Sequence, residues 1–428
     1  METAEIIAPD EPEATETSTG PPGIDPIRGN GRNPVMVEPD LNFIRVLIRT
    51  GGDTLKNCFQ CGTCSATCPL APALHPFPRK EMAWAVWGMK DRLLKDPDVW
   101  LCHHCNDCST NCPRGARPGD VLGAVRQQTI IHYALPRFMA RWVGDPRFIP
   151  ILLAIPALLL WGAIRYRDQI GGFLGFQTPT GQDIVYSFTP LLPHWLLNTF
   201  FGVFGLFALL AALVGVARFA GALKKSDVWG EDPQPEKGWW ASLGVVMRKI
   251  LTHHNFTFCE TDHRRSISHF GVFFGFLALV MVTLWVITGP INPLIRGEFI
   301  YPFNFFSPWK ILANLGGLAI LVGLLMMIWD RLYFGHLAGT SSYFDWFLLW
   351  TLFLVVASGF ATEILHYLRM GPHRHAAYFV HLVLVFGLLI YLPYSKFAHL
   401  LYRTTAMVFA ERYGRIVGEP MGVEGGEQ

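Results

Sequence analysis

Long runs of hydrophobic residues dominate the chain from about residue 148 onward, with short polar segments between them. Each of six runs approaches or exceeds the roughly 20 residues that a helix needs to cross a bilayer. The first run is the shortest and contains Pro156, so a helix buried inside the protein is the alternative for it. We therefore predict six membrane-spanning helices, at about 148–164, 194–223, 268–289, 309–333, 344–366 and 376–401.

Before these runs, apolar residues recur among polar ones with helical spacing. Asp40 has the position of an N-cap for a helix that ends at Gly51 and Gly52. Apolar residues recur every three or four positions over 79–96 and again over 119–135, which predicts two amphipathic helices. This part of the chain is therefore expected to fold as a small helical domain.

These patterns predict an all-α fold in which the helical domain precedes a six-helix transmembrane bundle. Residues 1–36 are acidic and rich in Pro, Thr and Gly, as disordered tails are. We place the helical domain at 37–140, the bundle at 145–405 and a cytoplasmic tail at 406–428.

The composition also indicates a membrane protein, because 51% of the 428 residues are hydrophobic and only 16% are charged. The net charge of +2 offers no argument for nucleic-acid binding. Lys and Arg are frequent between the second and third runs and scarce between the first and second. The positive-inside rule then puts both chain ends on the cytoplasmic side of the inner membrane. The loop at 334–343 would lie on the same side, although it has no Lys or Arg.

Eight of the nine cysteines fall in two copies of the pattern C-x2-C-x2-C-x3-C-P. Since no signal peptide is recognisable at the N-terminus, we expect these thiols to stay reduced in the cytoplasm. Two such copies are typical of two [4Fe–4S] clusters, in which the fourth cysteine of one copy binds the cluster of the other. Paired zinc sites are the alternative. The predicted ligand sets are Cys58, Cys61, Cys64 and Cys112 for cluster 1, and Cys102, Cys105, Cys108 and Cys68 for cluster 2.

Histidines of the last run predict haem b, since an ionisable side chain within a membrane span is costly and usually functional. His381 and His399 are eighteen positions apart, which is five helical turns and a rise of about 27 Å. On one continuous helix, kinked at Pro393, the two rings would share a face near opposite membrane surfaces, as two stacked haems require. Two unrelated interfacial histidines are the alternative.

Each of these histidines needs a second axial ligand from another helix. His269, at the start of the third run, would lie level with His399 and complete an inner haem site. For an outer site, His366 at the end of the fifth run is the first candidate partner of His381, and His194 is the second.

A candidate quinone site lies at the end of the fifth run, where Glu363 precedes His366 by three residues and shares its helix face. If His366 binds no haem, this pair could transfer protons at an outer quinone site. Ordinary interfacial polar residues are an equal alternative. The chain has no GxGxxG dinucleotide fingerprint, so a flavin would have to sit on another subunit.

Two parts of the sequence resemble known families. The stretch WLCHHCNDCSTNCPRG, in a helical setting, resembles the ferredoxin domain found in the C subunit of heterodisulfide reductase. The membrane part is similar to the cytochrome b subunit of the respiratory nitrate reductase gamma family, but Leu279 stands where that family has a second ligand on the earlier helix, so one or two haems are expected. With the stretch TFCETDHRRSISHFGVFFGF, the fusion resembles the C subunit of the quinone-interacting membrane-bound oxidoreductase family.

This resemblance implies a quinone-reactive electron-transfer subunit embedded in membrane lipid. It implies menaquinone as substrate, cytoplasmic partner subunits that carry flavin and iron–sulfur clusters, and electron exchange with adenylylsulfate reductase in sulfur metabolism. Two alternatives stay open. One is a menaquinol-oxidising cytochrome b subunit of a nitrate- or sulfite-reductase-linked complex, and the other is a membrane anchor that binds no haem.

Overall fold

The computed structural model contains helices and short 3-10 turns, and no strand is assigned in the part of the chain that it describes. The predicted all-α fold is therefore confirmed for that part. The predicted tail at 1–36 lies outside it. The described residues are 38–72, 76–176, 188, 191–230, 233–254, 256, 263–289, 303–334 and 339–415.

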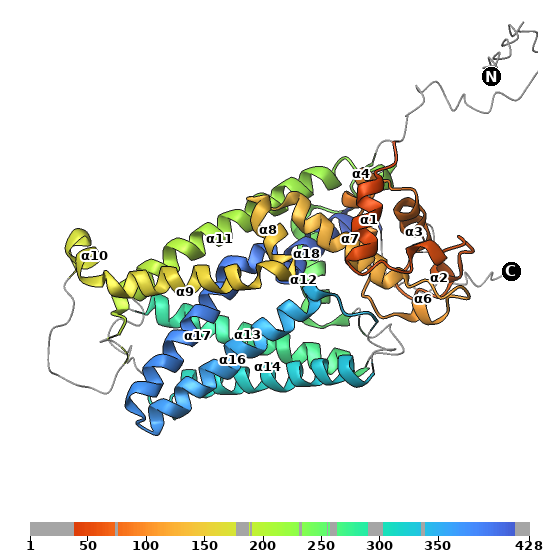
Figure 1. The fold of residues 1–428 in the computed structure, drawn as a ribbon. Coiled ribbons are helices and arrows are strands. Elements are labelled where there is room, and N and C mark those ends of the chain that lie inside the picture. The colour runs from red at the N-terminus through yellow and green to blue at the C-terminus, as the bar shows by residue number, and fades with distance from the viewer. Residues whose placement is uncertain are drawn as a thin grey trace, which may run out of the picture. The chain divides into compact units, whose positions relative to one another are not determined.

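Short helices form the N-terminal domain (Figure 1). Asp40 caps the first of them as predicted, because its carboxylate accepts a hydrogen bond of 2.8 Å from the backbone N–H of Phe43. The predicted helix over 79–96 is two helices, since Gly88 between them has a left-handed φ of +68° that ends a helix. The helices are α1 (Leu41–Arg49), α2 (Thr63–Ala66), α3 (Arg79–Val86), α4 (Lys90–Leu94), α5 (Asp98–Leu101), α6 (Asp107–Thr110), α7 (Pro118–Tyr133) and α8 (Arg137–Val143).

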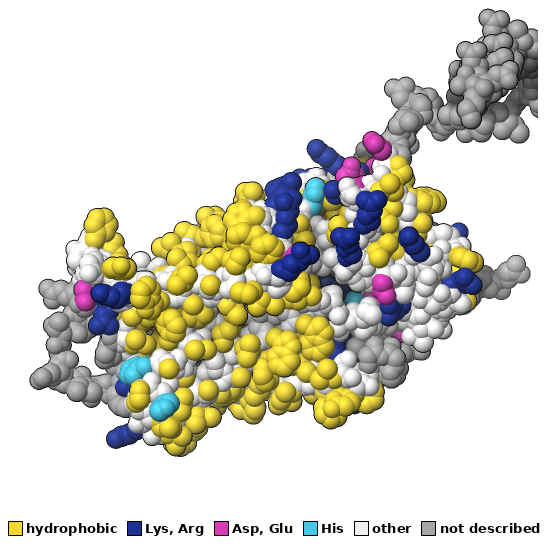
Figure 2. Space-filling model, in the orientation of Figure 1, with side chains coloured by type: hydrophobic (Ala, Val, Ile, Leu, Met, Phe, Trp, Pro, Cys, Tyr) yellow, Lys and Arg dark blue, Asp and Glu magenta, His cyan; other side chains and the backbone are white. Residues whose placement is uncertain are grey.

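Six helices of the described residues are long and apolar enough to cross a membrane, so the chain is a multi-pass membrane protein. Figure 2 shows hydrophobic side chains over most of the visible face of these helices, and Lys and Arg gathered where the short N-terminal helices begin. Leu158 of the first long helix is 65% exposed, which favours a span over a buried helix. The six are α9 (Ile149–Arg165), α11 (His194–Leu223), α13 (His263–Thr288), α14 (Pro308–Tyr333), α16 (Tyr343–Tyr367) and α17 (Gly371–Tyr391).

Glycines let the backbones of α13 and α14 touch. A Cβ atom added to Gly275 would lie 2.5 Å from the carbonyl oxygen of Gly316, and one added to Gly323 would lie 2.6 Å from that of Ser268. Membrane helices gain no hydrophobic stabilisation from leaving lipid for each other, so this close van der Waals packing is what holds such a pair together.

The last predicted span is two helices rather than one. α17 ends before Pro393, and α18 (His399–Arg412) begins after Ser395. Pro393 has no N–H group to continue the helix, and Ser395 is extended with a ψ of 177°. The prediction of one continuous helix over 376–401, with both of its histidines on one face, is therefore wrong.

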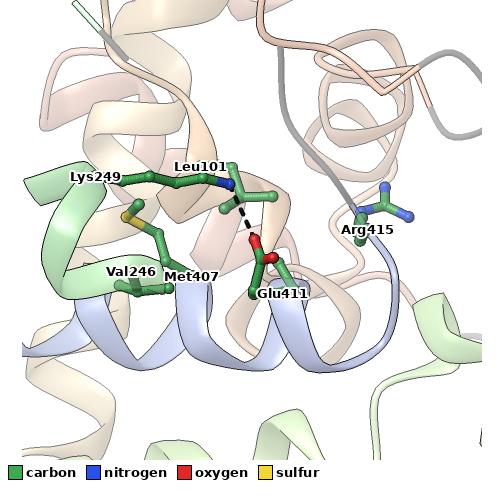
Figure 3. A pocket seen from close by; sticks show the side chains of 7 residues that line it. Leu101, Val246, Lys249, Met407, Glu411 and Arg415 are labelled. Atoms are coloured by element: carbon green, nitrogen blue, oxygen red, sulfur yellow. Dashed lines mark hydrogen bonds and ion pairs between the residues drawn. The ribbon is translucent and has the colours of Figure 1, made fainter. Parts of the chain in front are cut away.

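α18 also continues beyond the predicted end of the bundle and is buried, so residues 406–412 are not a tail. It packs against α5 of the N-terminal domain and against α12 (Trp239–Leu251), which lies between α11 and α13 in the chain. Lys249 of α12 donates a hydrogen bond of 2.9 Å to Glu411 of α18, beside a small hollow that Leu101 and Met407 also line (Figure 3).

A buried ion cluster ties Arg415, three residues after the end of α18, to the N-terminal domain. The ammonium nitrogen of Lys80 lies 2.8 Å from Asp98, 3.0 Å from Asp96 and 3.1 Å from Glu81. Arg415 donates a hydrogen bond of 2.7 Å to the other oxygen of Asp98. The three carboxylates are close enough to hold a metal ion, but Lys80 already supplies a cation at their centre.

This cluster makes stability depend on pH. Burial, followed by the charge of Asp96, raises the pKa of Glu81 well above its ordinary 4.5. A carboxyl group whose pKa is higher in the folded than in the unfolded state adds to the free energy of unfolding at low pH. The whole contribution is present below the pKa of the unfolded state, and it is lost as the pH rises through the pKa of the folded state.

Replacement of Glu81 by glutamine should therefore remove part of the fall in melting temperature as the pH rises above about 4.5, the ordinary pKa of this carboxyl group. Thermal unfolding of the purified chain in detergent measures this, with the exposed Asp91→Asn as the control. Identical pH dependence of the wild type and Glu81→Gln would contradict the account.

Replacement of Gly275 by leucine should separate α13 from α14, because the atom in its way is a backbone oxygen that cannot rotate aside. Overpacking of this kind costs about 1–3 kcal/mol or more. The melting temperature of the detergent-solubilised protein should fall, whereas Gly202→Leu, at a position with open space around it, should change it little. Equal melting temperatures of the two variants would contradict the close packing.

Candidate functional site

The two cysteine motifs have the same backbone turns. In the first motif, Gln60 and Gly62 have left-handed φ values of 59° and 88°. In the second, His104 and Asn106 occupy the corresponding positions with φ values of 58° and 71°. Left-handed residues turn the chain sharply, so that closely spaced thiols converge on one point.

The first group of thiols, which includes the fourth cysteine of the second motif, lines a single pocket. The cysteines of this group are Cys58, Cys61, Cys64 and Cys112. Gln60 donates a hydrogen bond of 3.2 Å to the sulfur of Cys58. Cys61 is exposed, and the ring of Phe59 beside it is 68% exposed. This group therefore has one edge open to water.

The second group is more buried. Burial raises the pKa of the Cys68 thiol to about 12, and the charges of Cys102 and Cys105 add to this effect. The pKa of the Cys108 thiol is raised by burial and then by the charges of Cys102, Cys105 and Cys68. These mutual effects place Cys68 among the first three cysteines of the other motif. Because thiols in this setting are costly to ionise, bound metal is what would hold them as thiolates, and the donor set fits iron–sulfur clusters.

Thr340, between α14 and α16, contacts the N-terminal domain. The backbone N–H of Thr340 donates a hydrogen bond of 3.2 Å to Asp120 of α7. Asp120 also lies 2.8 Å from Nε2 of His104, inside the second cysteine motif. Burial lowers the pKa of His104 to about 4 despite this carboxylate.

Aromatic side chains connect the second cysteine motif to the membrane helices. The His103 ring, between Cys102 and Cys105 in sequence, lies 4.8 Å edge-on from the ring of Phe256. The ring of Phe256 lies 5.3 Å from that of His269 at the start of α13. Nε2 of His103 is buried and has no hydrogen-bond partner among the described residues.

In the predicted inner pair, Nδ1 of each histidine has a hydrogen-bond partner. Nδ1 of His399 lies 2.7 Å from the backbone carbonyl of Lys396, and Nδ1 of His269 lies 3.1 Å from Nε2 of His253. A histidine whose Nδ1 is held in this way presents Nε2 to a metal, so both side chains fit axial ligation of a haem.

His381 is held in the same manner between α16 and α17. Its Nδ1 lies 3.1 Å from the carbonyl of Val355 and 3.1 Å from the hydroxyl of Ser358. Gly359 leaves room for the ring, because a Cβ atom there would lie 3.1 Å from it. His381 therefore also keeps Nε2 for a metal.

The structure does not bring His366 together with His381. His366 follows Ser358, the contact of His381, by eight positions on α16, which is about 12 Å along the helix. Nδ1 of His366 lies 3.5 Å from the guanidinium of Arg374. His194 is exposed at the start of α11.

Glu363 is part of an ion pair that no local pattern predicts. Its carboxylate lies 2.9 Å from the ammonium of Lys310 and accepts a hydrogen bond of 3.2 Å from Asn314, both on α14. His366 is three positions after Glu363, so the acid, the histidine and Lys310 form a polar group at the end of the bundle away from the cysteines.

Sequence reasoning missed His253, Phe256 and Lys310. His253 and Phe256 follow α12 outside any periodic segment, and Lys310 is a single charge at the start of a span. The stretch THHNF could have revealed His253, because it places further histidines shortly before His269 in the chain.

Comparisons with known proteins assign the two parts of the chain. Residues 54–116 match the 4Fe-4S dicluster domain. The chain is 36% identical over 89 residues to the C subunit of the H(2):CoB-CoM heterodisulfide,ferredoxin reductase of Methanothermobacter marburgensis. It is also 36% identical over 99 residues to an Archaeoglobus profundus protein named as similar to the C subunit of heterodisulfide reductase. These matches cover 21% and 23% of this chain and 48% and 53% of the two relatives, so the chain spans about half the length of each.

A longer match includes the membrane part. The chain is 26% identical over 392 residues to citrate utilization protein B of Escherichia coli, which covers 87% of this chain and 92% of that protein. No solved structure matches the chain. The family model of citrate utilization protein B matches residues 173–416, more than half of the sequence, and the chain therefore belongs to that family.

Proposed function

We propose that the chain is the membrane electron-transfer subunit of a quinone oxidoreductase complex. Electrons would pass between a quinone, haem b in the bundle, two [4Fe–4S] clusters and a flavin on a partner subunit. The observation that carries this proposal is the contact of His103, inside the second cysteine motif, with Phe256 and through it with His269.

The order of carriers follows from exposure. Cys102 and Cys108 are buried, and their loop accepts a hydrogen bond from Arg265 at the start of membrane helix α13, so cluster 2 would exchange electrons with the inner haem. Cys61 of cluster 1 is exposed, so cluster 1 would exchange electrons with a soluble partner. Phe59 and Arg114, which stack with the guanidinium carbon 4.1 Å from the ring centre, would contact that partner.

His269 and His399 would hold the inner haem, and His381 an outer haem if there are two. Bound haem would supply a carrier that accepts the two electrons of a quinol one at a time. The protein's part is to orient Nε2 of each histidine through the hydrogen bond at Nδ1.

Glu363 and His366 support a quinone site at the other end of the bundle. Quinol oxidation releases two protons with its two electrons, and Glu363 Oε2 and a ring nitrogen of His366 would accept them there. Lys310 lies against the carboxylate and compensates its charge between the two helices. The N-terminus and the iron–sulfur domain would lie in the cytoplasm, as the positive-inside rule predicts.

The physiological setting has two candidates. The resemblance to the quinone-interacting oxidoreductase family implies menaquinone and adenylylsulfate reductase. A relative similar over 87% of this chain is named for citrate utilization. Because that match includes the membrane part as well as the cysteine motifs, it favours a role in citrate utilization over one in sulfur metabolism.

The two cysteine groups should assemble clusters separately. Serine at Cys64 should remove the electron paramagnetic resonance (EPR) signal of cluster 1, and serine at Cys108 that of cluster 2, each lowering iron from about eight to about four atoms per chain. Iron analysis and EPR of the reduced chain measure this, and each variant is the control for the other. Zinc in place of iron, or one signal lost in both variants, would contradict the assignment.

Loss of an axial histidine should remove haem. Alanine at His269 or His399 should each eliminate the same haem signal in redox-difference spectra, because either change leaves the inner site with one ligand. Alanine at His381 should eliminate a second signal, and exposed His373, on the same helix, should be replaceable without loss. Unchanged haem in the His269 and His399 variants would sink the inner site, and wild-type protein without haem would make the bundle an anchor.

A further inference from the structure

Guanidinium groups converge on the loop that carries the second cysteine motif. Arg126 of α7 donates through Nε to the carbonyl of Val99 at 2.7 Å and through Nη2 to that of Cys102 at 2.8 Å. Arg403 of α18 donates to the carbonyls of Cys102 at 3.2 Å and of Leu101 at 3.3 Å. The chain thus brings one cation from the N-terminal domain and one from the last helix to the same loop.

A third guanidinium reaches this loop from the membrane bundle. Arg265, in the first turn of α13, donates to the carbonyl of His104 at 2.6 Å and lies 3.4 Å from that of His103. The three arginines therefore cover the consecutive carbonyls of residues 101–104 and the carbonyl of Val99.

Three cations are more than these carbonyls require. A neutral donor would also satisfy a carbonyl, so each guanidinium adds a positive charge to this partly buried interface beyond the hydrogen bonds that it donates. Among the described residues, Asp107 lies 3.3 Å from the sulfur of Cys105, and Asp120 lies 2.8 Å from Nε2 of His104. Asp120 already pairs with His104, Thr340 and Arg117. The positive charge of the three guanidiniums therefore lies at the loop that carries Cys102 and Cys105.

The first cysteine group has a different electrostatic setting. Arg79 and Arg114 line its pocket, but both side chains are exposed. Water screens exposed charges, so these two arginines act only weakly on the group beside them.

We propose that Arg126, Arg265 and Arg403 raise the reduction potential of the cluster held by Cys68, Cys102, Cys105 and Cys108. This inference rests on the iron–sulfur ligation of the proposed function. One-electron reduction of a [4Fe–4S] group adds one negative charge and neither makes nor breaks a bond, and the nearby cations favour the more negative state. They offset the penalty that burial imposes on that charge, so the cluster beside the inner haem site can accept an electron.

Replacement of Arg403 by glutamine tests this, because glutamine keeps a donor for the carbonyls and removes the charge. Two unit charges about 10 Å apart at an effective dielectric constant of about 20 change an equilibrium constant roughly tenfold. Reduction of cluster 2 should therefore become about tenfold less favourable, a fall of about 59 mV for a one-electron couple. EPR-monitored redox titration of the purified full chain measures the midpoint of each cluster.

Two matched variants separate charge from structure. Arg403→Lys keeps the charge and should retain most of the wild-type midpoint, and Arg114→Gln, at the exposed group, should leave the cluster 2 midpoint unchanged. Arg265→Gln removes a charge from a different helix and should lower that midpoint too, which keeps the test decisive if Arg403→Gln assembles no cluster 2.

Unchanged cluster 2 midpoints in Arg403→Gln and Arg265→Gln, with both EPR signals present, would overturn the inference and leave the proposed function intact. An equal fall in Arg403→Lys would also overturn it, since the effect would then be structural. Wild-type protein with no iron–sulfur signal would overturn the proposed function and this inference with it.

Discussion

The carbonyl groups of residues 101–104 lie where the N-terminal domain meets the membrane helices, and buried carbonyls must find donors. Arg126, Arg265 and Arg403 supply these donors from three helices that are far apart in sequence. The same contacts fix the second cysteine motif against α13 and α18. The placement of His103 beside Phe256, and of both beside His269, depends on this docking.

The docking also makes the two cysteine groups unequal, although their motifs share one pattern and the same left-handed turns. The group that contains Cys61 keeps an open edge, whereas the group that contains Cys102 and Cys108 is enclosed. A carrier for a soluble partner needs the first environment, and a carrier for a membrane cofactor needs the second. The repeated motif thus gives two different sites, because α13 and α18 contact the loop of the second motif.

Much of this arrangement could be predicted from local sequence. Cysteine spacing and the hydrophobic runs depend on neighbours along the chain, so the motifs, the helical domain and the spans were accessible. The break between α17 and α18 was not recognised, since Pro393 within an apolar run permits either a kink or an end, and the extended Ser395 decides for an end. His253 and Phe256 were missed because their roles come from contacts across the fold, and Lys310 because its partner Glu363 lies on another helix.

We expect electrons from the membrane to reach the exposed cluster through the buried one. Rapid mixing of the oxidised, purified chain with a water-soluble menaquinol analogue, with haem absorbance and freeze-quenched EPR followed over time, tests it most directly in the wild type and Cys108→Ser. Haem should be reduced in both proteins, whereas the exposed cluster should be reduced only in the wild type. Equally fast reduction of the exposed cluster in Cys108→Ser would contradict it.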